Sequence, residues 1–104
     1  MNVRFVYVTV GGKDEAAKIG KELVTSGLVA CVNILDNMRA LYMWEGKLQD
    51  DAEVVLIAKT TEVRIPELVE KIRSLHSDDC PCVLALPVMG GHQPFLDWVA
   101  QEVG

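Results

Sequence analysis

The sequence predicts an α+β domain of the ferredoxin-like kind, a β-α-β-β-α-β sandwich with a long β-hairpin and an extra C-terminal helix. Three observations predict it. Four segments have the apolar character of strands, two segments between them repeat apolar residues at helical spacing, and one glycine-containing turn joins the two middle strands. Because the chain has 104 residues, we expect a single domain over residues 1–104.

The first strand is expected over residues 3–10, where both faces are largely apolar and should therefore both be covered. Residues 14–26 follow as a helix, and its inner stripe is Ala16, Ile19, Gly20 and Leu23. The glycine in that stripe should let the helix approach the sheet closely. Gly27 is typical of the residue just after a helix, so the hairpin begins soon afterwards.

The hairpin runs from Cys31 to Thr61 and is the stretch around which the chain is organised. Gly46 supplies the positive φ of its turn, and we expect a bulge or break at Asp50 and Asp51. A dozen strand residues at about 3.3 Å each span roughly 40 Å, whereas a compact domain of this size has a radius of gyration of about 13 Å. The hairpin should therefore overhang its domain, and another subunit should cover its bulky tip.

A second helix is expected over residues 62–75, with Pro66 in or near its first turn and His76 at its end. A loop at 77–82 leads to a strand at 83–89, which is apolar throughout and is expected to be buried. A short helix then closes the chain. Two helices can cover only one face of such a sheet, so we expect self-association to cover the other face.

Composition limits the class of protein. Half of the residues are hydrophobic and the mean hydropathy is +0.21, which favours an oligomer. The net charge is −5 with no cluster of Lys or Arg, which argues against a nucleic-acid partner. No apolar run is long enough to cross a membrane, and the first residues lack the apolar block of a signal peptide. We expect a cytoplasmic protein whose three cysteines are reduced.

Several motifs, in order and at family spacing, resemble the CutA family, the divalent-cation tolerance proteins. They are Gly27-Leu-Val-Ala-Cys-Val-Asn33, Tyr42-x-Trp44-Glu-Gly-Lys47, Glu53-x-x-Leu56, Lys59-Thr-Thr61, His76, Pro81 and Phe95-Leu-x-Trp98. The resemblance covers residues 3 to 103. It implies a ferredoxin-like subunit, a tight homotrimer whose long strands pack edge to edge across subunits, and a link to copper and other divalent metals. The family also looks similar to the nitrogen-regulatory PII proteins, which bind nucleotides between subunits.

The loop after His76 departs from the family pattern. The family has His-Pro-Tyr-x-x-Pro-Glu there, whereas this chain has His-Ser-Asp-Asp-Cys-Pro-Cys. Asp78 stands in place of the aromatic residue, and Cys82 in place of the carboxylate after the proline. A family site that uses that tyrosine or glutamate would therefore be absent from this chain or would use other residues.

The strongest candidates for metal binding are His76, Cys80 and Cys82, which place soft donors within seven residues. Cu(I) accepts two or three such ligands, whereas a closed zinc site needs a fourth, which Asp78, Asp79 or water could supply. The alternative is structural. In it, the histidine caps the C-terminus of the preceding helix and the second cysteine is a small buried residue at a strand start.

Four hairpin residues are assigned to the subunit interface: Tyr42, Trp44, Glu53 and Lys59. Aromatic residues are enriched in such contacts, although the two here could also line a ligand pocket in a cleft between subunits. The Glu and Lys favour a cross-strand or intersubunit ion pair over acid–base chemistry. Cys31, where the family commonly has cysteine, is a further candidate metal ligand facing another subunit, or else a packed strand residue.

No Ser/His/Asp set, HExxH or Walker motif is present, so we expect no enzymatic activity. The sequence favours a cytoplasmic homotrimer that takes part in the response to metal ions, with copper or another divalent metal as the candidate ligand and no certain cofactor. Two alternatives stay open. One is a PII-like signalling trimer that binds a small anionic ligand in the intersubunit cleft, and the other is a purely structural trimer.

Overall fold

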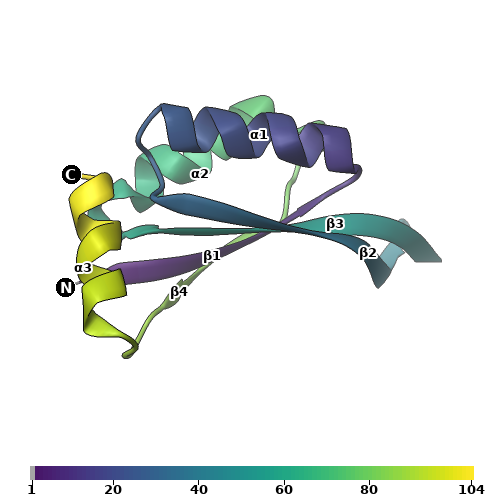
Figure 1. Ribbon diagram of the computed structural model, residues 1–104. Helices are drawn as coiled ribbons and strands as arrows, with labels where there is room; N and C mark the ends of the chain where they lie inside the picture. The colour runs from purple at the N-terminus through teal and green to yellow at the C-terminus, as the bar shows by residue number, and fades with distance from the viewer. Residues whose placement is uncertain (1) are drawn as a thin grey trace.

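The structure, a computed structural model, describes residues 2–104. One antiparallel sheet in strand order β2-β3-β1-β4 carries two helices on one face and a third helix at one end (Figure 1). The elements are β1 (Val3–Val10), α1 (Lys13–Thr25), β2 (Cys31–Trp44), β3 (Lys47–Thr61), the 3-10 helix η1 (Glu62–Arg64), α2 (Ile65–Leu75), β4 (Val83–Pro87) and α3 (Gln93–Glu102). The predicted ferredoxin-like α+β fold with an added C-terminal helix is confirmed.

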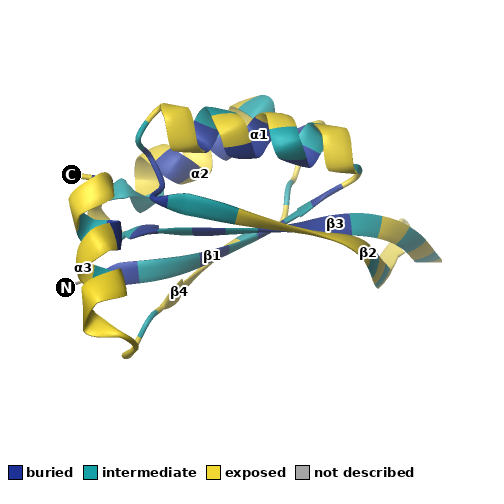
Figure 2. Ribbon diagram, viewed as in Figure 1, coloured by how far each residue is buried: buried dark blue, intermediate teal, exposed yellow. Residues whose placement is uncertain are grey.

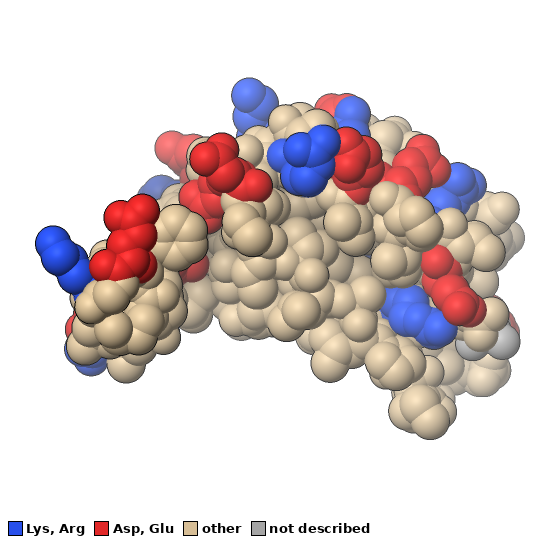
Figure 3. Space-filling view, turned by 180° about the vertical axis from the view of Figure 1, so that it is seen from behind, with Lys and Arg blue, Asp and Glu red and all other residues tan. Residues whose placement is uncertain are grey.

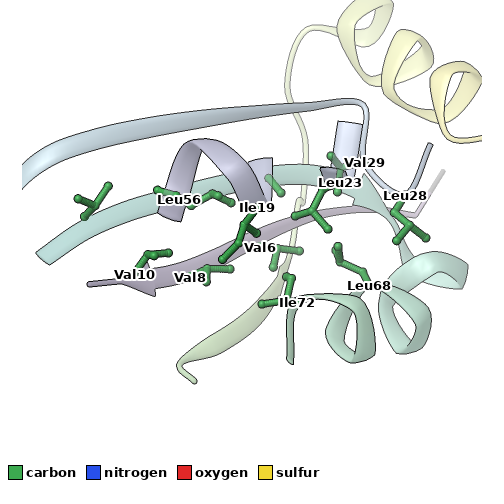
Figure 4. Close-up of a cluster of buried hydrophobic side chains, with 13 residues drawn as sticks. Val6, Val8, Val10, Ile19, Leu23, Leu28, Val29, Leu56, Leu68 and Ile72 are labelled. Atoms are coloured by element: carbon green, nitrogen blue, oxygen red, sulfur yellow. The ribbon is translucent and has the colours of Figure 1, made fainter. Parts of the chain in front are cut away.

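The core lies between the sheet and the two helices α1 and α2 (Figure 4). Val6, Val8 and Val10 of β1 point into it, because alternate residues of a strand face the same side, and both helices place their apolar stripes against the sheet. Its largest fully buried side chains include Val6, Val8, Ile19, Leu23, Leu56, Leu68 and Ile72. The close approach predicted for Gly20 is confirmed, since a Cβ there would lie 3.0 Å from Cγ2 of Val32.

The other face of the sheet is open in the single chain. Leu84 and Leu86 of β4 are 56% and 46% exposed, so the prediction that this strand is buried is wrong for one chain alone. The physical reason is that α1 and α2 cover only the opposite face (Figure 2). Seen from behind, charged side chains gather over the helices and at the hairpin, while the surface below the helices is largely uncharged (Figure 3).

The hairpin of β2 and β3 projects beyond the rest of the molecule (Figure 1). The whole chain, hairpin included, has extents of 44 × 25 × 22 Å. Large apolar side chains next to its turn are exposed, with Met43 at 64% and Leu48 at 68%, so the predicted overhang is confirmed. The predicted break at Asp50 and Asp51 is wrong, because β3 is continuous there.

The irregularity lies instead in β2, where residues 36 and 37 stand opposite the single residue Val54 between the pairs Leu35–Val55 and Met38–Glu53. Asn37 adopts φ 63°, which asparagine tolerates better than most residues. This two-against-one pairing is a β-bulge. It keeps Leu35 and Met38 on the same open face of the sheet, because the extra residue restores the alternation.

The third helix, α3, closes one end of the sheet. Val99 and Val103 pack there with Val3 and Ala30 in a second, smaller apolar cluster. None of the helices within residues 2–104 is long and apolar enough to span a membrane.

Candidate functional site

A cleft of about 870 Å³ lies between the hairpin, the end of β1 and the loop at residues 77–82. Its volume is within the range of small-molecule and cofactor sites. Two thiols and three carboxylates line it: Cys80, Cys82, Asp78, Asp79 and Glu53. Three aromatic side chains form further walls: Tyr7, Tyr42 and Trp44. The cleft therefore combines soft donors, negative charge and aromatic surface.

The cleft is acidic. Among the described residues that line it, Arg39 is the only Lys or Arg. Its guanidinium donates two hydrogen bonds to the carboxylate of Asp50, at 2.7 and 2.5 Å. This pair raises the pKa of Arg39 and lowers the pKa of Asp50, and it largely balances the one positive charge. The uncompensated carboxylates favour a cation over an anion in the cleft.

Tyr42 forms part of the cleft wall as a neutral phenol. Its hydroxyl donates to Oδ2 of Asp51 at 2.7 Å. This hydrogen bond, with the nearby carboxylate charges, raises the pKa of Tyr42 to about 12. At neutral pH the residue therefore offers a hydroxyl and a ring face, and no phenolate, to anything bound in the cleft.

His76 does not line the cleft, and its ring is fully buried beside it. Nδ1 accepts a hydrogen bond from the backbone N–H of Asp78 at 3.0 Å, so the proton of the neutral ring is on Nε2. Nε2 donates to the carbonyl oxygen of Thr9 at 2.8 Å. Both nitrogens are engaged, so neither is free to bind a metal in this conformation. The prediction that this residue ends α2 is confirmed, although its ring joins β1 to the loop and does not cap the helix.

Both ends of the loop are fastened to other elements. The backbone N–H and the hydroxyl of Ser77 donate to the two carboxylate oxygens of Glu15 at 2.8 and 2.9 Å. At the far end, the N–H of Thr9 donates to the carbonyl of Cys82 at 3.4 Å. The segment between these anchors presents its side chains to the cleft.

The two loop cysteines are free and exposed, and both line the same cleft. The alternative in which Cys82 is a small buried residue is wrong for the single chain. Cys31 is half-buried, pairs with Lys59 across β2 and β3, and does not line the cleft. The ammonium of Lys59 donates to Oδ1 of Asn33 on the neighbouring strand.

Within residues 2–104, no three His, Cys, Asp or Glu side chains are placed to hold a metal ion together. A closed zinc site needs four ligands, so the single chain does not present one. Two thiolates are enough for a soft monovalent ion such as Cu(I). Of the sequence-predicted donors, the pair Cys80 and Cys82 therefore fits a metal best. The assignment of Cys31, His76, Cys80 and Cys82 as ligands stays a prediction.

Sequence reasoning named seven residues that the cleft brings together: Tyr42, Trp44, Glu53, Asp78, Asp79, Cys80 and Cys82. Tyr7 and Arg39 are among the lining residues that it missed. The outward position of Tyr7 follows from strand alternation, which gives a usable signal. The role of Arg39 depends on the register of β2 against β3, which the residues of either strand alone do not give.

Together, fold and site define a ferredoxin-like subunit with a ligand-sized acidic cleft beside an overhanging hairpin. The sequence matches the family described as CutA1 divalent ion tolerance protein over residues 4–102. The chain belongs to this family.

Named relatives agree with this placement. The divalent-cation tolerance protein CutA of Thermus thermophilus is 37% identical over 99 residues, which cover 95% of this chain and 96% of the relative. The chloroplastic protein CutA 1 of Oryza sativa subsp. japonica is 42% identical over 94 residues, which cover 90% of this chain and 53% of the relative. The chain thus spans about half the length of the rice protein.

Solved structures show the same fold. The divalent cation tolerance protein Cut A1 from Thermus thermophilus superposes with a TM-score of 0.95 at 36% identity, and the match covers 98% of this chain and 99% of that one. CutA from Xylella fastidiosa superposes with a TM-score of 0.97 at 28% identity over 100% of both chains.

Proposed function

We propose that this protein acts as a homotrimer in the response to divalent metal ions and that it binds copper directly. The observation that carries the proposal is the acidic cleft, in which two exposed thiols lie among three carboxylates. Relatives named divalent-cation tolerance protein CutA support the general role. The proposal includes a cytoplasmic location, where thiols stay reduced, and no catalytic step.

Exposed apolar surface supports the homotrimer. The open face of the sheet exposes Leu84 and Leu86, and the hairpin tip exposes Met43, Trp44 and Leu48. Large apolar patches of this kind mark surfaces that another chain covers. A second and third copy of the same chain are the economical partners, since the tip of one hairpin can then cover the open sheet of the next subunit. Tyr42, Trp44, Glu53 and Lys59 are the proposed interface residues.

The charge of the cleft separates the metal proposal from its alternative. A PII-like trimer would need cationic groups to hold a small anionic ligand. Among the described residues of the cleft wall, Arg39 is the one Lys or Arg, and it is bound by Asp50. The carboxylates would repel an anion. The residues of a single chain therefore favour a metal cation as the ligand.

The proposal is tested by equilibrium dialysis of the purified reduced protein against copper, zinc, cobalt and nickel salts, with metal analysis of the retained fraction. We expect copper to be retained at a fixed ratio per chain, and light scattering to give a mass of three chains of 11.5 kDa each. Copper retention no higher than that of a cysteine-free, similarly acidic control protein would contradict direct binding. A monomer at micromolar concentration would contradict the trimer.

A further inference from the structure

We propose that Cys80 and Cys82 form a two-thiolate site for Cu(I), and that His76 is a positioning residue of this site and not a ligand. The inference rests on the proposed function and deepens it, because it names the oxidation state of the metal and the two donor atoms. The proposed site also depends on a departure from the family pattern described above, because this chain has Cys-Pro-Cys where that pattern has x-Pro-Glu.

The pair has the chemistry of a soft-metal site. Both cysteines are free and exposed, and both line the same cleft. Pro81 between them fixes its own φ and restricts the residue before it, so the backbone that carries the thiols has few conformations to lose on binding. Two thiolates satisfy Cu(I), whereas Zn²⁺ and other borderline ions require further ligands. Within residues 2–104, no group of three His, Cys, Asp or Glu side chains is placed to hold a metal ion, which favours an ion that needs only two donors.

The loop that carries the thiols is held in place before any metal binds. The ring of His76 joins the carbonyl of Thr9 to the N–H of Asp78 at the start of the loop, and Ser77 is fastened to Glu15 beside it. The carbonyl of Cys82 accepts a hydrogen bond from Thr9 at the other end. Such anchoring lowers the entropic cost of binding.

His76 serves this anchoring through both of its ring nitrogens. To become a ligand, the ring would have to give up either the N–H of Asp78 or the carbonyl of Thr9, and it would have to leave a fully buried position. Either change would release the loop that presents the thiols. Its contribution to metal affinity is therefore indirect, through the position of the loop.

The binding step needs no redox partner. Copper enters as Cu(I) from complexes with small thiols. As each cysteine sulfur forms its bond to copper, one copper–sulfur bond to a small thiol breaks, and the departing small thiolate takes up the proton that the cysteine releases. The oxidation state of copper is unchanged. In the protein, one Cu(I) ion replaces two thiol protons, which leave with the two small thiols. Asp78, Asp79 and Glu53 add negative charge around the site and draw the cation toward it.

The test is an anaerobic competition titration of the purified native protein against a chromophoric Cu(I) chelator. The variants are Cys80→Ser/Cys82→Ser, Cys31→Ser and His76→Asn, each checked for native fold by circular dichroism. We expect one Cu(I) per chain in the native protein and no competition by the double variant. Cys31→Ser should match the native protein. His76→Asn should keep the stoichiometry and the ultraviolet sulfur-to-copper band, with affinity lower by about 10- to 100-fold, as for other supporting residues of metal sites.

Five results would overturn the inference. Tight binding that survives in Cys80→Ser/Cys82→Ser, or that is lost in Cys31→Ser, would move the site elsewhere and leave the proposed copper function standing. Loss of stoichiometric binding in a folded His76→Asn protein would make the histidine a ligand. If the native protein fails to compete for Cu(I) yet retains Cu(II) in dialysis, the site fails and the proposed function survives. If it retains neither ion, both fail.

Discussion

His76 offers the sharpest test of how this structure holds its candidate site. Replacing it with leucine fills the buried position with an apolar side chain of similar volume and removes both ring nitrogens. The carbonyl of Thr9 then loses a donor, and the N–H of Asp78 loses an acceptor. The ring is fully buried, so water does not replace the first of these partners without a change in the structure.

The size of the effect follows from these two bonds. A protein hydrogen bond contributes about 0.5–1.5 kcal/mol net, and a buried group left unpaired costs about 1–3 kcal/mol. Asp78 is exposed, so solvent can satisfy its N–H after the substitution. His76→Leu should therefore lower the free energy of unfolding by about 2 kcal/mol.

The assay is urea denaturation followed by circular dichroism at one fixed protein concentration, because the stability of an oligomer depends on concentration. With a denaturant slope of about 2 kcal/mol per molar, the midpoint should fall by roughly 1 M. His92→Leu is the matched control, since His92 is exposed and its side chain makes no cap hydrogen bond. It should change stability by less than about 0.5 kcal/mol. An equally small change in His76→Leu would refute the role given to the buried ring.

Three further predictions concern packing, a buried hydroxyl and a titration. Gly20→Ala gains about 1 kcal/mol of helix propensity, but its Cβ would lie 3.0 Å from a methyl of Val32, and overpacking costs about 1–3 kcal/mol. Urea denaturation should therefore show a net loss of about 1 kcal/mol in the free energy of unfolding. A net gain would mean that β2 shifts to make room for the added methyl group. Thr60→Val keeps the shape of a fully buried side chain but removes its 2.7 Å hydrogen bond to a backbone carbonyl. The free energy of unfolding should fall by about 1–2 kcal/mol. An unchanged midpoint of urea denaturation would contradict this. Asp51→Asn should lower the pKa of Tyr42 from about 12 toward the ordinary value of 10.0, as measured by ultraviolet titration of the phenol. Because the folded pKa is raised, the stabilisation from Tyr42 is present below pH 10.0 and is lost as the pH rises toward about 12; a native protein whose Tyr42 titrates at its ordinary pKa would contradict the pairing.

Much of the fold could be predicted because its signals are local. Strand alternation, helical spacing and the turn at Gly46 predict the order of the helices and strands. The family resemblance also implies that they form a ferredoxin-like sandwich. The bulge in β2 could not be placed, because two adjacent aspartates look like a break. In the structure these aspartates bind Arg39 and Tyr42, each reached diagonally across the hairpin.

The candidate site was predictable in part for the same reason. The thiols and the acidic loop are adjacent in the sequence, so their gathering could be anticipated. The state of His76 could not, because its partner Thr9 lies 67 residues away. Only the three-dimensional structure, which brings β1 next to the end of α2, shows that both ring nitrogens already take part in hydrogen bonds. A histidine near two cysteines suggests a ligand until its hydrogen bonds are known.

The most direct test of the Cu(I) site is X-ray absorption spectroscopy at the copper edge on the protein loaded with one Cu(I) per chain. The two-thiolate site predicts a two-coordinate Cu(I) edge and a first shell of sulfur alone, unchanged in Cys31→Ser. An imidazole nitrogen in the first shell, or a sulfur shell that persists in Cys80→Ser/Cys82→Ser, would contradict it.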